Sequence, residues 1–239
     1  MRQGSKFSFK GGVVHIVRIL GENFTFVIEV GGATISVDPG EADPVLQRLD
    51  DEGLDLTHML ITHHHHDHIM GADEIKRATG CVVYGPAQQR QPFVDHGLGE
   101  GDTVSAGAIT FEVLSTPGHL TPLLTYYAPK EGLLFSSDII FGCGCGRVAN
   151  GEYATMWQSI QRLAALPDHT AIFFAHDYTA DNIRFALSVD PDNKALKERA
   201  GDPAVVPTTV ALEKATNPFV RASSAARFED LRRRKDVFR

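Results

Sequence analysis

Residues 62–68 read Thr-His-His-His-His-Asp-His, and this stretch decides how the rest of the chain is interpreted. It contains the spacing H-x-H-x-D-H, in which His63, His65, Asp67 and His68 take the named places. A predicted apolar strand runs directly into it. Because alternate side chains point the same way as a chain leaves a strand, the first two histidines are expected to face one point. The Asp-His pair is expected to face a neighbouring point.

Imidazole and carboxylate groups are good ligands for zinc, iron or manganese. Two such ions at about 3.5–4 Å would form a two-metal clamp. The alternatives are a solvated polar loop or the remnant of an affinity tag. A tag is terminal and uninterrupted, whereas this run is internal, follows a strand and ends in Asp-His. The sequence therefore predicts a metal site.

Three downstream residues are placed to complete that site, because each follows a predicted strand: His119, Asp138 and His176. In layered α/β folds, functional side chains gather in the loops beyond strand ends. A lone histidine or aspartate at a strand end is usually a surface or capping residue. Their order behind the histidine run makes a shared role the preferred interpretation.

Composition limits the remaining possibilities. The chain has 239 residues, 43% hydrophobic and 22% charged, which is ordinary for a globular protein. A net charge of −7 disfavours a general nucleic-acid binder. Three cysteines do not suggest a disulfide framework and favour a reducing cytoplasm. There is no apolar run long enough to span a membrane and no signal-peptide core.

The order of predicted elements divides the chain near residue 177. Strands and helices are mixed over residues 1–176, whereas residues 177–239 show short helical patterns broken by prolines and no convincing strand. We therefore expect an α/β body with a small helical addition. His15, outside the histidine run, is interpreted as a surface or capping residue.

The sequence around these residues resembles that of the metallo-β-lactamase superfamily and, within it, that of the glyoxalase II (hydroxyacylglutathione hydrolase) family. The resemblance extends through nearly the whole chain. Its segments are THHHHDH at 62–68, TPGH at 116–119, Asp138, GCGR at 144–147, AHDYT at 175–179, NPF at 217–219 and RRRKD at 232–236. The C-terminal helical segment is the best support for the narrower family.

This resemblance implies an αββα four-layer sandwich with two divalent metal ions. His63, His65 and His119 would hold the first ion and Asp67, His68 and His176 the second, with Asp138 bridging both. A metal-bridging hydroxide would hydrolyse S-(2-hydroxyacyl)glutathione, such as S-D-lactoylglutathione. The resemblance makes Asp67 and Asp138 the catalytic residues among the ligands, and the partner is a small-molecule thioester. We expect a monomer or small homo-oligomer.

The resemblance also implies contacts to glutathione from Arg147, Tyr178, Arg232 and Lys235. Each has a plainer interpretation: a solvent-exposed loop arginine, a core tyrosine, or the charged face of a helix. Asp38, at the end of a predicted strand, would orient a ligand imidazole or form an ordinary turn.

The chain departs from the family on the substrate side. After TPGH the family usually has Thr-x-Gly-His, whereas this chain has Leu120-Thr121-Pro122-Leu123. The Thr-Gly that precedes the bridging aspartate in the family is Ser136-Ser137 here, and a tyrosine often found in the family is Ala149. The main alternative is therefore a lactonase or another thioesterase of the same fold. A mononuclear-iron persulfide dioxygenase would need only His63, His119 and Asp138. A nuclease or a non-catalytic metal-binding domain fits less well.

Overall fold

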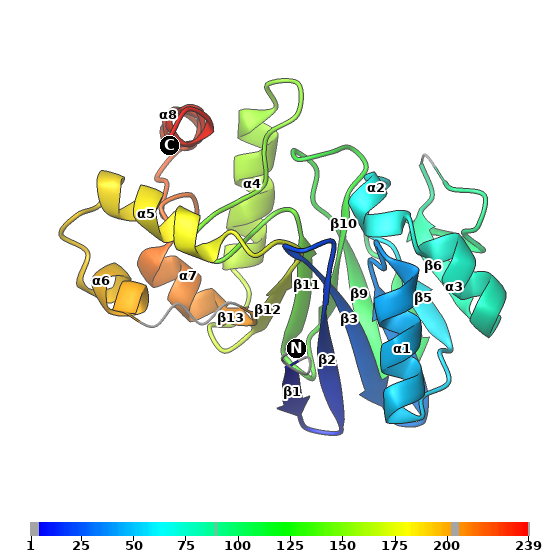
Figure 1. Cartoon of the computed structure of the whole chain (residues 1–239). Coiled ribbons are helices and arrows are strands. Elements are labelled where there is room, and N and C mark those ends of the chain that lie inside the picture. Colours follow the sequence, from blue (N-terminus) through cyan, green and yellow to red (C-terminus); the bar gives the residue numbers. More distant parts are fainter. Residues whose placement is uncertain (1–4, 89, 202–205, 239) are drawn as a thin grey trace. The chain divides into compact units, whose positions relative to one another are not determined.

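The first seven strands pair in sequence order into one sheet in the computed structural model of the chain (Figure 1). Strands β1 to β4 are antiparallel, and β4 to β7 are parallel. The structure describes residues 5–88, 90–201 and 206–238. The strands are β1 (Lys6–Phe9), β2 (Gly12–Ile19), β3 (Asn23–Val30), β4 (Ala33–Val37), β5 (His58–Leu60), β6 (Val82–Pro86) and β7 (His96–Leu98).

Short helices connect the parallel strands of this sheet. They are α1 (Ala42–Glu52), α2 (His66–Ile69) and α3 (Ala72–Thr79). One apolar cluster joins α1 and α3 to strands β2, β3, β5 and β6, and it includes Val45, Ile75, Met59 and Val83. This packing buries one face of the sheet.

Gly31 and Gly32 form the hairpin turn that joins β3 to β4. Both glycines have positive φ, 53° and 80°, which the tight turn requires and glycine adopts without strain. A side-chain carbon on Gly31 would lie 2.5 Å from the Cβ of Ala108. The turn therefore packs against the hairpin of β8 (Thr103–Ala106) and β9 (Ile109–Ser115).

The described chain divides into two compact units. The first spans Met1–Ser115 and Leu124–Glu131 and includes the seven-stranded sheet. It also contains β8, β9 and β10 (Leu124–Ala128), which pair antiparallel in that order.

The second unit spans Thr116–Leu123 and Gly132–Arg239. Its strands β11 (Leu133–Ser137) and β12 (Ala171–Phe174) are parallel, and β13 (Thr208–Thr209) joins β12 antiparallel. Its helices are α4 (Tyr153–Ala164), α5 (Thr179–Val189), α6 (Lys194–Gly201), α7 (Val210–Thr216) and α8 (Ala225–Asp236).

Two sequence-based expectations are wrong. Strand β13 lies beyond residue 176, where no strand is predicted, because two residues are too few to show an alternating pattern. His15 is not at the surface: its side chain is only 1% exposed within β2. Its ring nitrogens lie 3.6 Å from Glu29 and 3.8 Å from Glu52, and burial lowers its pKa.

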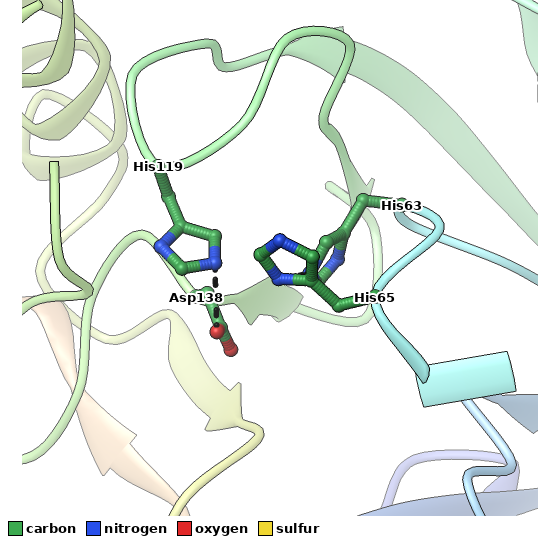
Figure 2. Close-up of side chains that lie close together, drawn as sticks. All are labelled: His63, His65, His119 and Asp138. Atoms are coloured by element: carbon green, nitrogen blue, oxygen red, sulfur yellow. Dashed lines mark hydrogen bonds and ion pairs between the residues drawn. The ribbon is translucent and has the colours of Figure 1, made fainter. Parts of the chain in front are cut away.

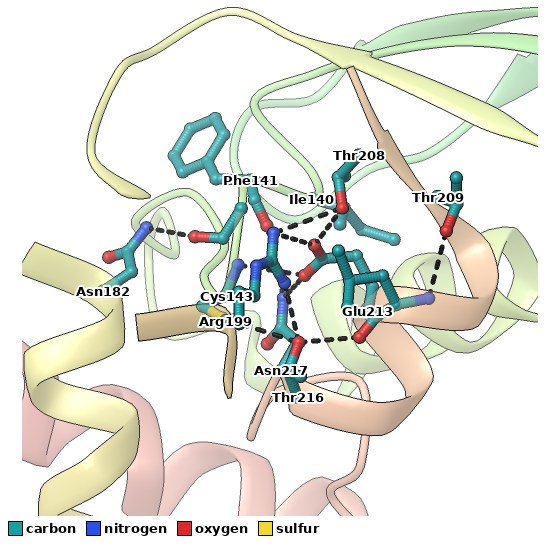
Figure 3. A network of polar contacts seen from close by, with 12 residues as sticks. Ile140, Phe141, Cys143, Asn182, Arg199, Thr208, Thr209, Glu213, Thr216 and Asn217 are labelled. Carbon is teal, nitrogen blue, oxygen red and sulfur yellow. Dashed lines mark hydrogen bonds and ion pairs between the residues drawn. The ribbon is translucent and has the colours of Figure 1, made fainter. Parts of the chain in front are cut away.

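A buried polar network joins α6 and α7 to the loop that follows β11 (Figure 3). Arg199 pairs with Glu213 at 2.7 Å, and both side chains are at most 3% exposed. The other carboxylate oxygen of Glu213 accepts hydrogen bonds from the Cys143 backbone N–H at 3.0 Å and from Asn217 at 2.8 Å. Because both terminal nitrogens of Arg199 and both carboxylate oxygens of Glu213 have partners, this charge pair can stay inside the protein.

No helix within the described ranges combines the length and the apolar character needed to cross a membrane.

Replacing Glu213 by glutamine should lower the free energy of unfolding by about 3 kcal/mol, because it leaves the Arg199 charge buried without its counter-ion. The matched control is Lys214→Gln on the same helix, where the pair with Asp168 is 43% and 70% exposed. That change should cost less than about 1 kcal/mol. Urea unfolding of the two variants checks the difference, and equal stabilities would contradict a structural role for the buried pair.

Candidate metal centre

In the first unit, the histidine run lies at the carboxyl end of two parallel strands. Val37 of β4 is in register with Leu60 of β5, so the residues after both strands emerge side by side. The Asp38 backbone N–H donates to the Leu60 carbonyl at 3.0 Å. This register places Asp38 beside the start of the run.

The side chains of the run lie close to one another. His63 Nε2 lies 3.1 Å from His65 Nδ1, and His68 Nε2 lies 3.6 Å from Asp67 Oδ2. Helix α2 begins at His66, and its first turn brings the His68 ring to 4.1 Å from the His63 ring, measured between centroids. Two ring nitrogens that face each other at 3.1 Å can share only one proton, whereas a cation would use both lone pairs.

Asp38 holds the outer side of this group. Its Oδ1 accepts from the Thr62 N–H at 2.8 Å, and its Oδ2 accepts from the Thr62 hydroxyl at 2.6 Å. His68 Nδ1 also lies 2.9 Å from Oδ2. When that nitrogen donates, Nε2 on the other side of the ring is the one that faces Asp67 Oδ2. These contacts keep Asp38 in a left-handed conformation, with φ at 49°.

Two contacts around the run have no sequence signal. Asn23 donates from Nδ2 to Asp67 Oδ2 at 2.9 Å, and Thr62 binds Asp38 as described above. Asn23 is 44 positions from Asp67 along the chain. No local pattern links residues that far apart, so only the sheet register reveals them.

The second unit repeats the arrangement at the end of its own parallel strands. Ser137 of β11 is in register with Phe174 of β12, and Asp138 and His176 follow these strands. Asp138 Oδ2 lies 3.2 Å from His119 Nε2, and Asp138 Oδ1 lies 3.2 Å from His176 Nε2. Asp138 is 5% exposed. Each carboxylate oxygen therefore faces one imidazole, as a carboxylate bridging two ions would require.

Figure 2 draws His119 and Asp138 of this unit together with His63 and His65 of the first. The backbone behind His119 sets its ring orientation. His119 Nδ1 lies 2.9 Å from the Arg147 carbonyl, so donation there fixes the ring with Nε2 directed at Asp138. A side chain on Gly146 would overlap the Asp138 carbonyl and lie 3.0 Å from His119 Nδ1. Only glycine fits at that position without displacing Asp138 or His119.

The residues predicted to contact glutathione occupy different environments. Arg147 is exposed. Tyr178 is 39% exposed and stacks on His176, with ring centroids 5.1 Å apart and planes 1° apart. Phe141, which sequence reasoning missed, meets His176 edge-on at 5.5 Å.

The two basic residues predicted on α8 are less accessible. Arg232 is 5% exposed and donates to the Cys145 carbonyl and to Asp236. Lys235 is half-buried, and its ammonium donates to the Asp181 carbonyl at 3.2 Å. Burial and the neighbouring Arg232 lower the pKa of Lys235.

The cysteines of this unit are unsuited to nucleophilic catalysis. Burial raises the pKa of Cys143 and of Cys145 to about 11. Both thiols therefore stay protonated at neutral pH, and the thiol is a poor nucleophile.

The described residues thus carry clusters of histidine and aspartate of the kind that bind divalent metal ions. The donor set fits such an ion: His68 and His119 each have one ring nitrogen held by an oxygen and Nε2 directed at a carboxylate. This arrangement supports metal-ligating histidines in known sites.

Two protein families match adjacent stretches of the chain. Residues 10–176 match the metallo-beta-lactamase superfamily, and residues 177–238 match the hydroxyacylglutathione hydrolase C-terminus. The α/β metallo-β-lactamase fold predicted from the sequence is confirmed. Among solved structures, ETHE1 from Myxococcus xanthus has a TM-score of 0.71 at 26% identity, covering 91% of this chain and 88% of its own. BLEG-1 B3 metallo-beta-lactamase has a TM-score of 0.65 at 24% identity, covering 83% and 94%.

Closer relatives narrow the family. Hydroxyacylglutathione hydrolase of Rhizobium meliloti (strain 1021) is 42% identical over 87% of this chain and 91% of its own length. The protein of the same name from Methylococcus capsulatus (strain ATCC 33009 / NCIMB 11132 / Bath) is 41% identical over 93% and 97%. The chain therefore belongs to the hydroxyacylglutathione hydrolase family of hydrolases, as the sequence predicted.

Replacing Asp38 by asparagine should weaken metal binding about 10- to 100-fold, because His68 loses the charged acceptor that orients its ring. Competition with a chelator measures this affinity directly. Asp55→Asn removes an exposed charge from the same unit and serves as the control. Equal affinities in the two variants would show that Asp38 does not orient His68.

Proposed function

We propose that this chain hydrolyses S-(2-hydroxyacyl)glutathione thioesters, such as S-D-lactoylglutathione, to glutathione and a 2-hydroxy acid. The relatives that carry the name hydroxyacylglutathione hydrolase align with about nine-tenths of the chain. The observation that carries the proposal is Asp138, whose two oxygens face His119 and His176. That pattern suits a carboxylate that bridges two ions.

The proposed site holds two divalent ions, zinc or, with mixed occupancy, iron or manganese. His63, His65 and His119 would bind the first, and Asp67, His68 and His176 the second, with Asp138 shared. When bound, the ions would supply a hydroxide at neutral pH and stabilise negative charge on the thioester carbonyl oxygen.

The protein's own groups do the positioning. Asp38 and the Arg147 carbonyl fix the rings of His68 and His119 from behind. Asn23 restrains Asp67 from its open side. Groups held this way need little reorganisation when the reaction begins, which favours catalysis. The proposed nucleophile is water: its oxygen would bond to the thioester carbonyl carbon, the carbon–sulfur bond would break, and the glutathione thiolate would take up the proton that water releases.

Residues 177–239 are proposed as the substrate-binding region beside a catalytic part over residues 1–176. Glutathione carries two carboxylates, so cations and hydrogen-bond donors suit its pocket. The exposed Arg147, the half-exposed Tyr178 and the half-buried Lys235 are candidate contacts. Arg232 would have to release Asp236 to bind the ligand directly.

A cytoplasmic location is proposed as well. It is supported by three free cysteines, all buried.

Hydrolysis of S-D-lactoylglutathione, measured with metal content on the same sample, tests the proposal. Rapid turnover with about two ions per chain is expected. A loaded site with negligible turnover, combined with turnover of a lactone or a thioester lacking glutathione, would contradict the glutathione assignment.

Two substitutions separate the roles of ligand and substrate contact. Asp138→Ala should lose metal and activity together, because a shared ligand is removed. Arg147→Ala should keep its metal, because the backbone carbonyl that faces His119 is unchanged, and should raise KM, because a cation proposed to contact glutathione is removed. Metal analysis and steady-state kinetics on both variants distinguish these outcomes, and two fully occupied ions in Asp138→Ala would refute the ligand assignment.

A further inference from the structure

The backbone from Cys145 to Arg147 packs directly on the metal ligands of the second unit. The Arg147 carbonyl lies 2.9 Å from His119 Nδ1, and Gly146 leaves no room for a side chain beside Asp138 and His119. Two residues further on, the Ala149 N–H donates to the Gly118 carbonyl at 2.9 Å. The position of His119 therefore depends on where this loop segment lies.

The C-terminal region holds the first half of the same loop. Asn217 Nδ2 donates to the Gly144 carbonyl at 2.9 Å and to the Phe141 carbonyl at 3.3 Å (Figure 3). Glu213 accepts from the Cys143 N–H in the same network. These contacts reach the loop only as far as Gly144. The following residues, 145–147, include the Arg147 carbonyl that contacts His119.

Arg232 of α8 holds that second half. Its Nη1 donates to the Cys145 carbonyl at 3.1 Å, and its Nε and Nη2 donate to Asp236 Oδ1 at 3.1 and 2.8 Å. The guanidinium carbon lies 5.2 Å from the Phe219 ring centroid. The side chain is 5% exposed. The planar guanidinium is therefore hydrogen-bonded in its plane and packed on an aromatic ring through its face, and these contacts together fix its orientation. The flexible ammonium of a lysine at this position would not be fixed in this way.

The basic residues that follow Arg232 contact other groups. Arg233 pairs with Glu229 at 2.9 Å, and Arg234 lies 3.9 Å from Asp230, on largely exposed side chains. Lys235 bonds the Asp181 carbonyl. The four consecutive basic residues therefore differ in their partners, and Arg232 is the one among them that is hydrogen-bonded to Cys145.

We propose that Arg232 is a positioning residue for the metal ligand His119 and acts through the backbone of Cys145–Arg147. The inference rests on the proposed function because it takes His119 as a ligand. It assigns the C-terminal helix a role in shaping the metal centre, distinct from a contact between Arg232 and glutathione. A substrate contact alone would affect KM and leave metal affinity unchanged.

The test is Zn²⁺ affinity by chelator competition in the full chain, without substrate. Arg232→Gln should weaken one of the bound ions about 10- to 100-fold. Arg234→Gln removes a charge from the same helix and should stay within about twofold of wild type, because exposed ion pairs contribute little. The visible spectrum of the Co²⁺-loaded Arg232→Gln protein should also change, since the ligand geometry at His119 changes.

The outcomes separate the inference from the proposed function. Wild-type affinity and an unchanged Co²⁺ spectrum in folded Arg232→Gln, with a raised KM, would overturn the positioning role alone. If the wild-type chain binds no metal, the ligand assignment itself fails, and the positioning role fails with it. Should Arg232→Gln not fold, Asp236→Asn decides, because its 40% exposed side chain can change without disturbing the core. A lower Zn²⁺ affinity in Asp236→Asn supports the proposal, and a Zn²⁺ affinity equal to that of the wild type contradicts it.

Discussion

The candidate site depends on the way a carboxylate and an imidazole emerge together from a pair of parallel strands. In the first unit Asp38 follows β4, and the histidine run follows β5. In the second, Asp138 follows β11 and His176 follows β12. Parallel register brings the carboxyl ends of neighbouring strands to one edge, so polar groups that are far apart in the chain become neighbours. Parallel strand register thus positions the candidate site residues in both units.

The two units use their carboxylates differently. Asp38 is turned to the outer side of His68 and accepts three hydrogen bonds from protein groups. Asp138 lies between two imidazoles that both present Nε2. A carboxylate surrounded by donors orients its neighbours, whereas one facing imidazole lone pairs is suited to a cation. This difference supports Asp38 as an orienting residue and Asp138 as a ligand.

Helices α6, α7 and α8 make hydrogen bonds to the loop that follows β11. The buried Arg199–Glu213 pair and Asn217 hold residues 141–144, and Arg232 reaches Cys145. A region that resembles a substrate-binding addition in sequence is therefore also joined by hydrogen bonds to the backbone behind His119. Such a link allows substitutions in the helices to affect metal binding without touching a ligand.

Local spacing determined much of this protein by itself. The H-x-H-x-D-H run identified a candidate metal site, because imidazole and carboxylate side chains at this spacing on a short segment suit a divalent ion. Long-range pairing decided the rest. The contact between Arg232 and Cys145 joins residues 87 positions apart, and that between Asn23 and Asp67 spans 44. The burial of His15 and the two-residue strand β13 likewise follow from neighbouring strands and not from their own residues. Hydrogen-bond partners at such separations exist only once the strands have paired and the helices have packed, so tertiary structure alone decided them.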